Sequence, residues 1–339
     1  LASLFAGLVL IVQAMGGAIS QSIVTYRFYM HGRKHFTQTG WKTHSAAYGH
    51  GQDLQSMNLR GRVHVVTGAN SGIGREVCEY LVGRGSRVYM VCRNADRGKQ
   101  ARDEIAEKVG GADVHLLVAD CGLAADMRRV ASELKEKEAE GIDCLVCNAG
   151  AMTPKRTLTS EGHEVTFASH FLHGTYLLSQ ELRPLIKKNE GRVVAVSSGG
   201  MLNVKYDHGY ATGAKGSYDK QLSYAYAKRA QVLMCEYLAN QPGEQITFVS
   251  CHPGWTDTPG VEFAYGSQRK WLQPMRTLWE GAEGICWLCV APTDEIKAGS
   301  FYLDRQPQKT SLASWTSNTK KEVEEMMAAA RAATNSQGS

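Results

Sequence analysis

The chain has 339 residues, of which 43% are hydrophobic and 21% are charged, and its formal net charge is +5. This composition excludes a largely disordered chain, and the modest charge gives no reason to expect a nucleic-acid partner. A chain of this length can form a sizeable core, either as one α/β domain with extensions or as two small domains.

The N-terminal region is apolar and carries no charged side chain over its first 26 residues. A helix needs about 20 apolar residues to span the hydrocarbon core of a bilayer. We therefore predict that residues 1–26 form a helix that anchors the protein in a membrane. The alternatives are a helix that docks on the protein body and the remnant of a targeting signal.

Basic residues follow this region before the first acid, Asp53, is reached. The positive-inside rule then places the body on the cytosolic or matrix side of the membrane. The mitochondrial inner membrane is the first predicted location, and the endoplasmic reticulum is the second. The basic residues that follow the apolar region are Arg27, Arg33, Lys34 and Lys42.

The remaining chain divides into a basic connecting segment (27–61), a main domain (62–319) and a C-terminal helix and tail (320–339). Within the main domain, short apolar runs alternate with segments long enough for crossover helices. This alternation predicts a Rossmann-type, doubly wound α/β fold with a parallel seven-stranded sheet. The expected strands are 63–67, 87–92, 114–118, 142–147, 192–196, 246–250 and 299–302.

A glycine-rich turn, Thr67-Gly68-Ala69-Asn70-Ser71-Gly72-Ile73-Gly74, follows the first expected strand and precedes a helix. In that context backbone N–H groups and a helix N-terminus can bind a pyrophosphate. The spacing is Gly-x-x-x-Gly-x-Gly, and the alternative is a turn that needs glycine for its conformation alone.

The second expected strand ends at Cys92 and is followed by Arg93. An acid here would bind the ribose hydroxyl of NAD, whereas an arginine can pair with the additional phosphate of NADP. Arg93 therefore favours NADP(H) over NAD(H). The alternative is an ordinary surface pair between Arg93 and Asp96.

The nine cysteines are odd in number and scattered through expected strands and helices, which argues against a disulfide framework. Cys144 and Cys147 point to opposite faces of a strand and cannot grip one metal ion. Cys286 and Cys289 lie in an apolar run, where free cysteine behaves as a small hydrophobe. We predict no metal site.

Tyr224 and Lys228 are four residues apart on an expected helix, and the adjacent serines Ser197 and Ser198 lie upstream. Residues at this spacing share a helix face, so the Lys228 ammonium is expected to favour the ionised form of the Tyr224 phenol. A phenol with a pKa near 10 needs such help to exchange protons at neutral pH. Tyr226 is a competing phenol, but it faces another direction.

The glycine turn, an Asn-Ala-Gly segment, the serine pair, the Tyr-x-x-x-Lys pair and Pro253-Gly254 occur in this order. With these motifs the chain resembles the short-chain dehydrogenase/reductase family from about residue 28 to residue 330. It is most similar to the branch of that family called SDR family member 12. The segments that carry this narrower likeness are 196–202, 252–261 and 304–307.

The resemblance implies an NADP(H)-dependent oxidoreductase that moves hydride between nicotinamide and a carbonyl or secondary alcohol. It assigns Tyr224 as the acid/base, gives Lys228 a further contact with the nicotinamide ribose, and uses Ser198, or less favourably Ser197, to orient the substrate oxygen. Asp120 matches the adenine contact. The implied cofactor-binding residues are Gly68, Asn70, Ser71, Gly72, Ile73, Gly74, Arg93, Asp120, Asn148, Ala149, Gly150, Tyr224, Lys228, Pro253, Gly254 and Thr258.

The chain departs from the family pattern at two places. Cys147 replaces the first Asn of the usual Asn-Asn-Ala-Gly segment. His170 occupies the position of an active-site Asn that holds a water linking the lysine to solvent, and the nearby Gly is displaced. Histidine can relay protons near neutral pH, but it is bulkier than asparagine. An alternative function is therefore a structural or cofactor-sensing subunit of a membrane complex, for example a mitochondrial one, with little turnover.

Two stretches, 201–222 and 255–274, interrupt the alternation of strands and helices and are expected to form loops or short helices. Loops at the carboxyl ends of parallel strands bind ligands in α/β folds. Their aromatic residues suggest an apolar pocket for a lipid-like or aromatic carbonyl, or alternatively a cover for the sheet or a partner contact. These aromatic residues are Trp255, Phe263, Tyr265 and Trp271.

Overall fold

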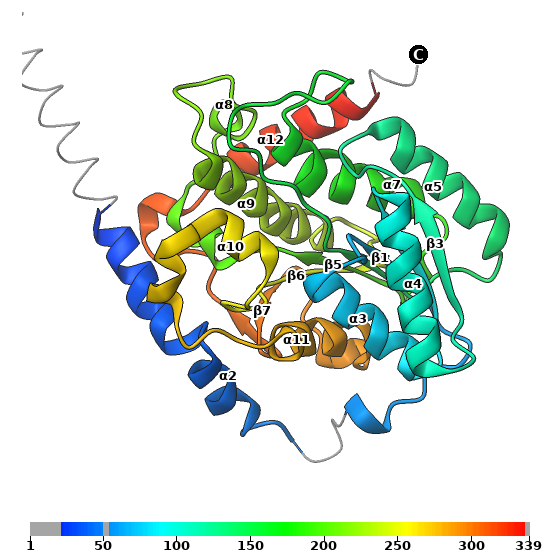
Figure 1. The fold of residues 1–339 in the computed structure, drawn as a ribbon. Helices are drawn as coiled ribbons and strands as arrows, with labels where there is room; N and C mark the ends of the chain where they lie inside the picture. Colours follow the sequence, from blue (N-terminus) through cyan, green and yellow to red (C-terminus); the bar gives the residue numbers. More distant parts are fainter. Residues whose placement is uncertain (1–21, 50–53, 336–339) are drawn as a thin grey trace, which may run out of the picture.

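Within residues 22–49 and 54–335, which the computed structural model describes, eight strands form one sheet (Figure 1). The strand order is β3-β2-β1-β4-β5-β6-β7-β8. The first seven strands pair in parallel, and β8 pairs antiparallel with β7. The strands are β1 (Val63–Thr67), β2 (Arg87–Cys92), β3 (Val114–Val118), β4 (Cys144–Cys147), β5 (Arg192–Val196), β6 (Thr247–Cys251), β7 (Phe301–Leu303) and β8 (Gln306–Gln308).

The expected doubly wound sheet is confirmed, but the expected number of strands is wrong by one. The additional strand, Gln306–Gln308, is short and polar, so its sequence gives no strand signal. The turn before it places Asp304 and Arg305 at positive φ, at 50° and 65°. Such turns usually carry glycine or asparagine, and this one therefore lacks the usual hairpin signature.

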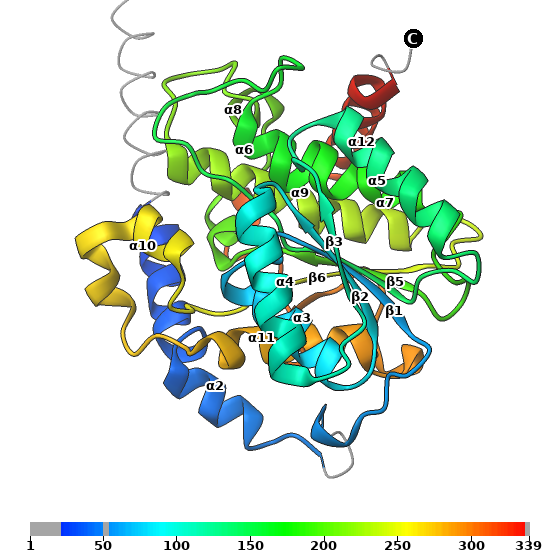
Figure 2. The same cartoon turned by 45° about the vertical axis from the view of Figure 1, so that its right-hand side comes forward.

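Helices cover both faces of the sheet, as Figure 2 shows. Three helices lie on one side of the sheet and four on the other, where the outermost, α12, packs on α9, and each side has its own buried cluster. The helices of the first face are α3 (Gly72–Gly83), α4 (Ala95–Val109) and α11 (Leu278–Val290). Those of the second are α5 (Ala124–Lys137), α7 (Leu178–Leu182), α9 (Lys220–Ala239) and α12 (Lys320–Asn335).

Shorter elements occupy the loops around the sheet. The segment Ala168–Leu177, η2, is a π-helix between α6 and α7. The two stretches expected to break the alternation do contain short helices. The short elements are α2 (Gln38–Ser45), η1 (Leu54–Ser56), α6 (Val165–Phe167), η3 (Gly199–Asn203), α8 (His208–Ala211), α10 (Pro259–Tyr265), η4 (Gly266–Leu272), η5 (Thr293–Glu295) and η6 (Ser314–Thr316).

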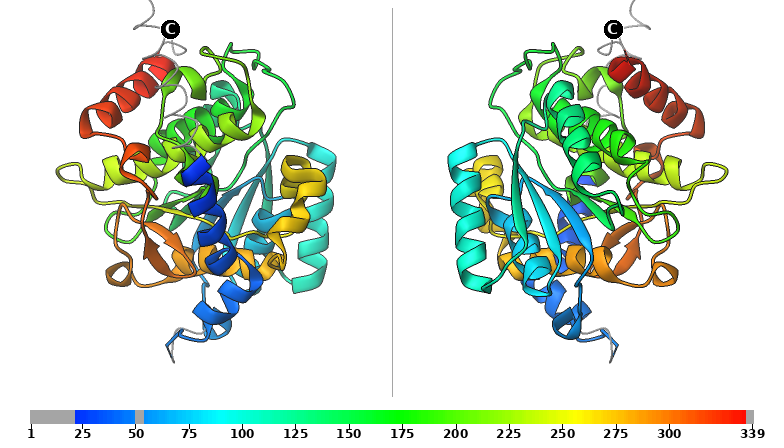
Figure 3. Two further views of the ribbon diagram at one scale, coloured as in Figure 1. Left: turned by 90° about the vertical axis from the view of Figure 1, so that its left-hand side faces the viewer. Right: turned by 90° about the vertical axis from the view of Figure 1, so that its right-hand side faces the viewer.

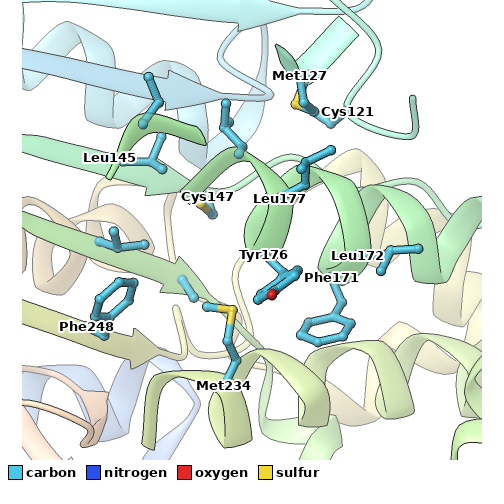
Figure 4. Close-up of a cluster of buried hydrophobic side chains, with 14 of the residues drawn as sticks. Cys121, Met127, Leu145, Cys147, Phe171, Leu172, Tyr176, Leu177, Met234 and Phe248 are labelled. Atoms are coloured by element: carbon cyan, nitrogen blue, oxygen red, sulfur yellow. The ribbon is translucent and has the colours of Figure 1, made fainter. Parts of the chain in front are cut away.

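The central strands are buried along their whole length. Every residue of β1, β4, β5 and β6 is buried, because helices cover both faces of parallel strands. Figure 4 shows one part of this core, in which Phe171 and Tyr176 lie near Met234 of α9. The C-terminal helix contributes to the same core with Met326 and Met327, so it is less polar in its packing than the sequence indicated.

Residues 22–35 form a helix that lies along the protein body beside α10 (Figures 1 and 3). The expected boundary at residue 26 falls within this helix, and residues 1–21 lie outside the described residues. Among the residues that the structure describes, no helix has the length and apolar character needed to cross a bilayer.

All nine cysteines are free thiols and buried. In the described part of the chain, no three or more His, Cys, Asp or Glu side chains come together as metal ligands would.

Candidate active site

The turn between β1 and α3 packs so closely that it requires glycine. Gly68 has a φ of +66°, and a Cβ on it would lie 2.8 Å from the Cα of Ala149. A Cβ on Gly74 would lie 2.4 Å from the Asn148 side chain and 2.5 Å from the Gly68 carbonyl oxygen. Any side chain at these two positions would push the turn away from the loop that follows β4.

Hydrogen bonds tie the same turn to the loop after β4. Thr67 Oγ1 accepts from the N–H groups of Asn148 (3.0 Å) and Ala149 (2.9 Å). The Asn148 side chain donates to the carbonyl oxygens of Thr67 (3.0 Å) and Gly68 (3.3 Å). Asn148 therefore holds the turn in shape, and its side chain is committed to backbone partners.

A cleft of about 180 Å³ lies beside the turn, at the carboxyl ends of β1 to β4. Seven residues that the sequence predicted as cofactor contacts line it: Gly68, Asn70, Ser71, Arg93, Asp120, Ala149 and Gly150. Seven further lining residues were not predicted: Val91, Asn94, Arg97, Ala119, Cys121, Ala151 and Ser169. A cleft at the carboxyl ends of parallel strands is the usual ligand position in this fold class.

The charged groups of the cleft are Arg93, Arg97 and Asp120. Arg93 lies 3.7 Å from Asp120, both partly exposed, so the surface pair expected as the alternative involves Asp120 and not Asp96. Arg97 was missed because nothing in the sequence separates it from other surface arginines of α4. Its position one turn after Arg93 in an N-capped helix was the available signal. With two guanidinium groups, of Arg93 and Arg97, and one carboxylate, of Asp120, the cleft has a net positive charge, which suits a phosphate ligand.

The N-terminus of α3 opens beside this cleft. Ser71 is the N-cap residue, but its side chain makes no capping hydrogen bond to the helix. The first-turn N–H groups therefore have no side-chain cap, and the helix dipole there favours negative charge.

A second group of polar side chains lies on α9 and at the end of β5. The Lys228 ammonium lies 5.6 Å from the centre of the Tyr224 ring and donates to the Val196 carbonyl oxygen at 2.6 Å. The two predicted residues thus share one face of the helix. Tyr226 instead stacks on the ring of Tyr210 at 5.7 Å.

The two serines make different contacts. Ser197 is buried, and its hydroxyl donates to the carbonyl oxygen of Lys228 at 2.8 Å. The Ser198 hydroxyl accepts from the N–H of Gly200 at 3.2 Å and also interacts with the Tyr224 hydroxyl. Only Ser198 therefore presents its side chain to the phenol.

Burial is the main cause of the pKa shifts of Tyr224 and Lys228. Burial raises the pKa of Tyr224 to about 12, although the hydrogen bond with Ser198 opposes the shift. Burial also lowers the pKa of Lys228 to about 7, against smaller contributions from Cys251 and Cys147. The expected lowering of the phenol pKa by the lysine is wrong for this structure, because burial raises the pKa of Tyr224 and the Lys228 ammonium donates to a backbone carbonyl.

His170 lies between the cleft and the tyrosine. Its ring stands perpendicular to the Tyr224 ring at 5.1 Å, and Nε2 lies 3.1 Å from the Ala151 carbonyl oxygen. A Cβ on Gly150 would lie 1.7 Å from this ring, so the histidine fits only because residue 150 is glycine. Burial and the Lys228 charge lower the pKa of His170 well below its usual value, which keeps the ring neutral.

The π-helix η2 sets the position of His170. Its carbonyl oxygen accepts from the Thr175 hydroxyl at 2.6 Å and from the Gln231 side chain at 2.8 Å. The wider turn of a π-helix, with bonds between residues five apart, is rare and often occurs at functional sites. The sequence showed the unusual histidine and the displaced glycine but not the change in helix type.

The segment after β6 lies across from the glycine turn. Gly254 has a φ of +76°, and the methyl carbon of Thr258 would lie 3.8 Å from a Cβ on Gly72. The Thr258 hydroxyl accepts from Val261 and caps α10. Thr258 therefore faces the α3 N-terminus, whereas Gly254 packs on the Arg276 side chain, and neither these two residues nor Pro253 line the cleft itself.

Comparisons with known proteins agree with this geometry. A family model described as "short chain dehydrogenase" matches residues 62–265. Dehydrogenase/reductase SDR family member 12 is 33% identical over 304 residues in human, covering 88% of this chain and 94% of that protein. The cow protein is 33% identical over 288 residues, covering 84% and 89%. Mouse retinol dehydrogenase 11 is 30% identical over 258 residues, covering 74% and 80%.

Solved structures share the fold. An uncharacterized protein from Mycobacterium paratuberculosis has a TM-score of 0.67 and 23% identity, covering 83% of this chain and 97% of its own. The angucycline C-6 ketoreductase LanV with bound NADP has a TM-score of 0.59 and 23% identity, covering 76% and 97%.

Proposed function

Because the chain belongs to the short-chain dehydrogenase/reductase family and is one of its oxidoreductases, we propose that it transfers hydride between NADP(H) and a carbonyl or secondary alcohol. The observation that carries this proposal is that an open cleft with two arginines ends near the half-buried Tyr224 and the buried Lys228. The nicotinamide cofactor would supply or accept the hydride when bound.

The cleft residues fit a phosphorylated dinucleotide. The uncapped N-terminus of α3 and the glycine turn suit a pyrophosphate, and Arg93 with Arg97 suits the additional phosphate of NADP. Asp120 is assigned to the adenine side. The ketoreductase LanV, which has the same fold and was solved with bound NADP, supports this choice of cofactor.

The proton is assigned to Tyr224. Since burial raises its pKa to about 12, the phenol is protonated at neutral pH and can donate to a carbonyl oxygen as that oxygen gains negative charge. The Ser198 hydroxyl, which already contacts the phenol, would hold the same oxygen.

Lys228 and His170 are assigned to the support of this proton transfer. With a pKa near 7, the lysine changes charge close to neutral pH, and its ammonium would stabilise the phenolate that remains after donation. The neutral His170 ring packs on the phenol and would restrict its position and its exposure to water.

The decisive experiment is the variant Tyr224→Phe. We expect NADPH-dependent carbonyl reduction to fall by about 10²- to 10⁴-fold, which is the usual contribution of a general acid. NADPH binding, measured by cofactor fluorescence, should persist. The matched control is Tyr226→Phe, whose ring lies on Tyr210 and whose activity should stay near wild type. If wild type binds NADPH but consumes none across a broad carbonyl panel, the proposal is wrong.

An apolar substrate is the favoured class. The mouse relative, retinol dehydrogenase 11, is named for an apolar alcohol, and Tyr265 packs at partial burial near the Tyr224 side of the site. Trp255 is instead buried in the core. This position favours the alternative from the sequence in which the aromatic residue covers the sheet. A panel that ranks carbonyls by chain length would test this preference.

Membrane attachment through residues 1–26 completes the proposal, with the mitochondrial inner membrane favoured over the endoplasmic reticulum. The apolar, uncharged sequence and the basic residues after it support attachment. Carbonate extraction of fractionated membranes would test both the attachment and the choice of membrane.

The alternative of an accessory subunit without turnover gains no support from the comparisons.

A further inference from the structure

The helix at residues 22–35 has two apolar faces. Val24, Phe28 and Gly32 recur every four residues and lie toward the body, where Phe28 packs on the cluster around Trp255. The side chains of Ile23, Tyr26 and Met30 are exposed. At about 100° per residue, this second stripe lies on the opposite side of the helix, away from the protein.

The exposed stripe continues onto α10 and η4. The Tyr29 hydroxyl donates to the Trp271 carbonyl oxygen at 3.3 Å, which brings η4 next to the helix. Trp271 is 58% exposed and Phe263 of α10 is 46% exposed. Figure 3, in its left view, shows α10 and the N-terminal helix on the same side of the molecule. Leu222, at the start of α9, extends the stripe because its neighbour Gln221 donates to Ala264.

Six of the ten large hydrophobic side chains that are exposed in the described residues belong to this surface. We call it the interfacial face and define it by Ile23, Tyr26, Met30, Leu222, Phe263 and Trp271. An exposed patch of this kind, rimmed by polar residues, usually marks an interaction site.

The charges around the interfacial face are mostly positive. Lys220 lies 4.6 Å from the centre of the Phe263 ring, and Lys270 lies 5.5 Å from that of Trp271. Three acids lie nearby: Asp257 and Glu262 are paired with Arg269, and Asp219 caps α9 beside Leu222. The helix at residues 22–35 adds three exposed cations, Arg27, Arg33 and Lys34.

We propose that the interfacial face lies on the surface of a bilayer that contains anionic lipid. Aromatic side chains combined with lysines are the composition of membrane-interface segments, in which the apolar groups enter the lipid and the cations meet the headgroups. The uncharged residues 1–21 lead directly into residue 22, at one end of this face. Charge and chain position therefore favour lipid over a protein partner.

This inference goes beyond attachment through residues 1–26, because it places α10 and η4 on the lipid as well. The chain runs from the Pro253–Thr258 segment directly into α10. If the proposed function holds, an apolar substrate reaches the site from the bilayer without crossing water.

The nine buried native cysteines allow a direct test, because an introduced surface cysteine is labelled selectively. The full chain is reconstituted with vesicles of phosphatidylcholine and phosphatidylglycerol after Phe263→Cys is labelled with a nitrobenzoxadiazole dye. The dye should emit more strongly and at shorter wavelength, and shallow spin-labelled lipids should quench it, since interfacial groups enter about 5–10 Å into the bilayer. Val118→Cys, 40% exposed at the far edge of the sheet, is the matched control and should show neither effect.

A second variant tests the chemistry of the face. Adding Lys270→Ala and Trp271→Ala to the labelled Phe263→Cys protein should lower the quenching by at least about half, because one aromatic side chain and one cation are lost. Unchanged emission at residue 263 in vesicle-bound protein overturns the inference, as does protection of that residue by another protein in native membranes. Neither result depends on turnover, so the proposed reaction is judged separately by its NADPH assay.

Discussion

The β1–α3 turn and the segment after β6 form two sides of the candidate active site, and different forces hold them. Thr67, Gly68 and Asn148 shape the turn through backbone hydrogen bonds and missing side chains, all within one half of the sheet. The segment after β6 is held by residues from the two ends of the chain. The Trp255 N–H donates to the Phe36 carbonyl oxygen at 2.7 Å.

A buried ion pair stabilises this second side. Arg276 binds Asp304 through two nitrogens, at 2.5 and 2.7 Å, and donates to the carbonyl oxygens of His35 (2.8 Å) and Phe36 (3.0 Å). The Phe36 ring fills the space where a Cβ on Gly199 would be, directly after Ser198. We call the β1–α3 turn with the loop after β4 the cofactor side, and the segment after β6 with the N-terminal segment packed on it the docked side. The cofactor side is held by residues within 67–149, whereas the docked side requires the N-terminal segment to be in place.

The largest expected effect comes from breaking the buried pair. Asp304→Ala leaves the Arg276 guanidinium buried without its carboxylate, which should lower the free energy of unfolding by about 3–5 kcal/mol in urea denaturation. The control is Asp113→Ala, because Asp113 pairs with Arg87 and both side chains are 43% exposed. That variant should lose at most about 1 kcal/mol. If both variants lose the same free energy of unfolding, the buried Arg276–Asp304 pair does not stabilise the docked side more than an exposed pair would.

Acid should weaken the docked side. Burial lowers the pKa of His252 to about 3, with further lowering by Arg276 and His31, while Asp304 opposes the shift. Since the unfolded chain titrates near 6.5, it binds more protons than the folded chain as the pH falls below that value. Stability is fully present above about pH 6.5 and is lost progressively toward pH 3, by about 3 kcal/mol at pH 4 for this residue alone.

The neighbouring His35 strengthens the same trend, because burial and the charges of His31, His44 and Lys34 lower its pKa to about 4 against the attraction of Asp304. Hydrogen exchange, corrected for intrinsic exchange rates, should therefore show faster opening of residues 22–45 at pH 5 than at pH 7. His252→Leu should flatten the pH dependence, since neither ring nitrogen has a hydrogen-bond partner among the described residues. Equal corrected opening rates of residues 22–45 at pH 5 and pH 7 would contradict this expectation.

The smallest expected effect concerns the cofactor side. Arg93→Ala should weaken NADPH binding by about 10- to 100-fold, which is the usual value of a charge-assisted hydrogen bond to phosphate, and should leave NADH binding nearly unchanged. Titration of cofactor fluorescence measures both affinities. Arg102→Ala is the control, because Arg102 lies on α4 and pairs with Asp103 outside the cleft. Unfolding stability should not change in either variant, which separates this side from the docked one.

The sequence by itself determined the parts of the protein that depend on local patterns. Largely apolar runs indicated the seven parallel strands, since strands covered by helices on both faces are rich in apolar residues. The glycine turn was readable because close backbone packing admits no side chain there. The spacing of Tyr224 and Lys228 on one helix fixed their shared face.

Only the tertiary structure decided features that depend on contacts between distant residues. The docking of Phe36, the pairing of Arg276 with Asp304 and the position of Arg97 in the cleft leave no periodic trace in the sequence. Burial also reversed the expected direction of the Tyr224 pKa, because desolvation depends on everything packed around the phenol and not on its neighbours along the helix.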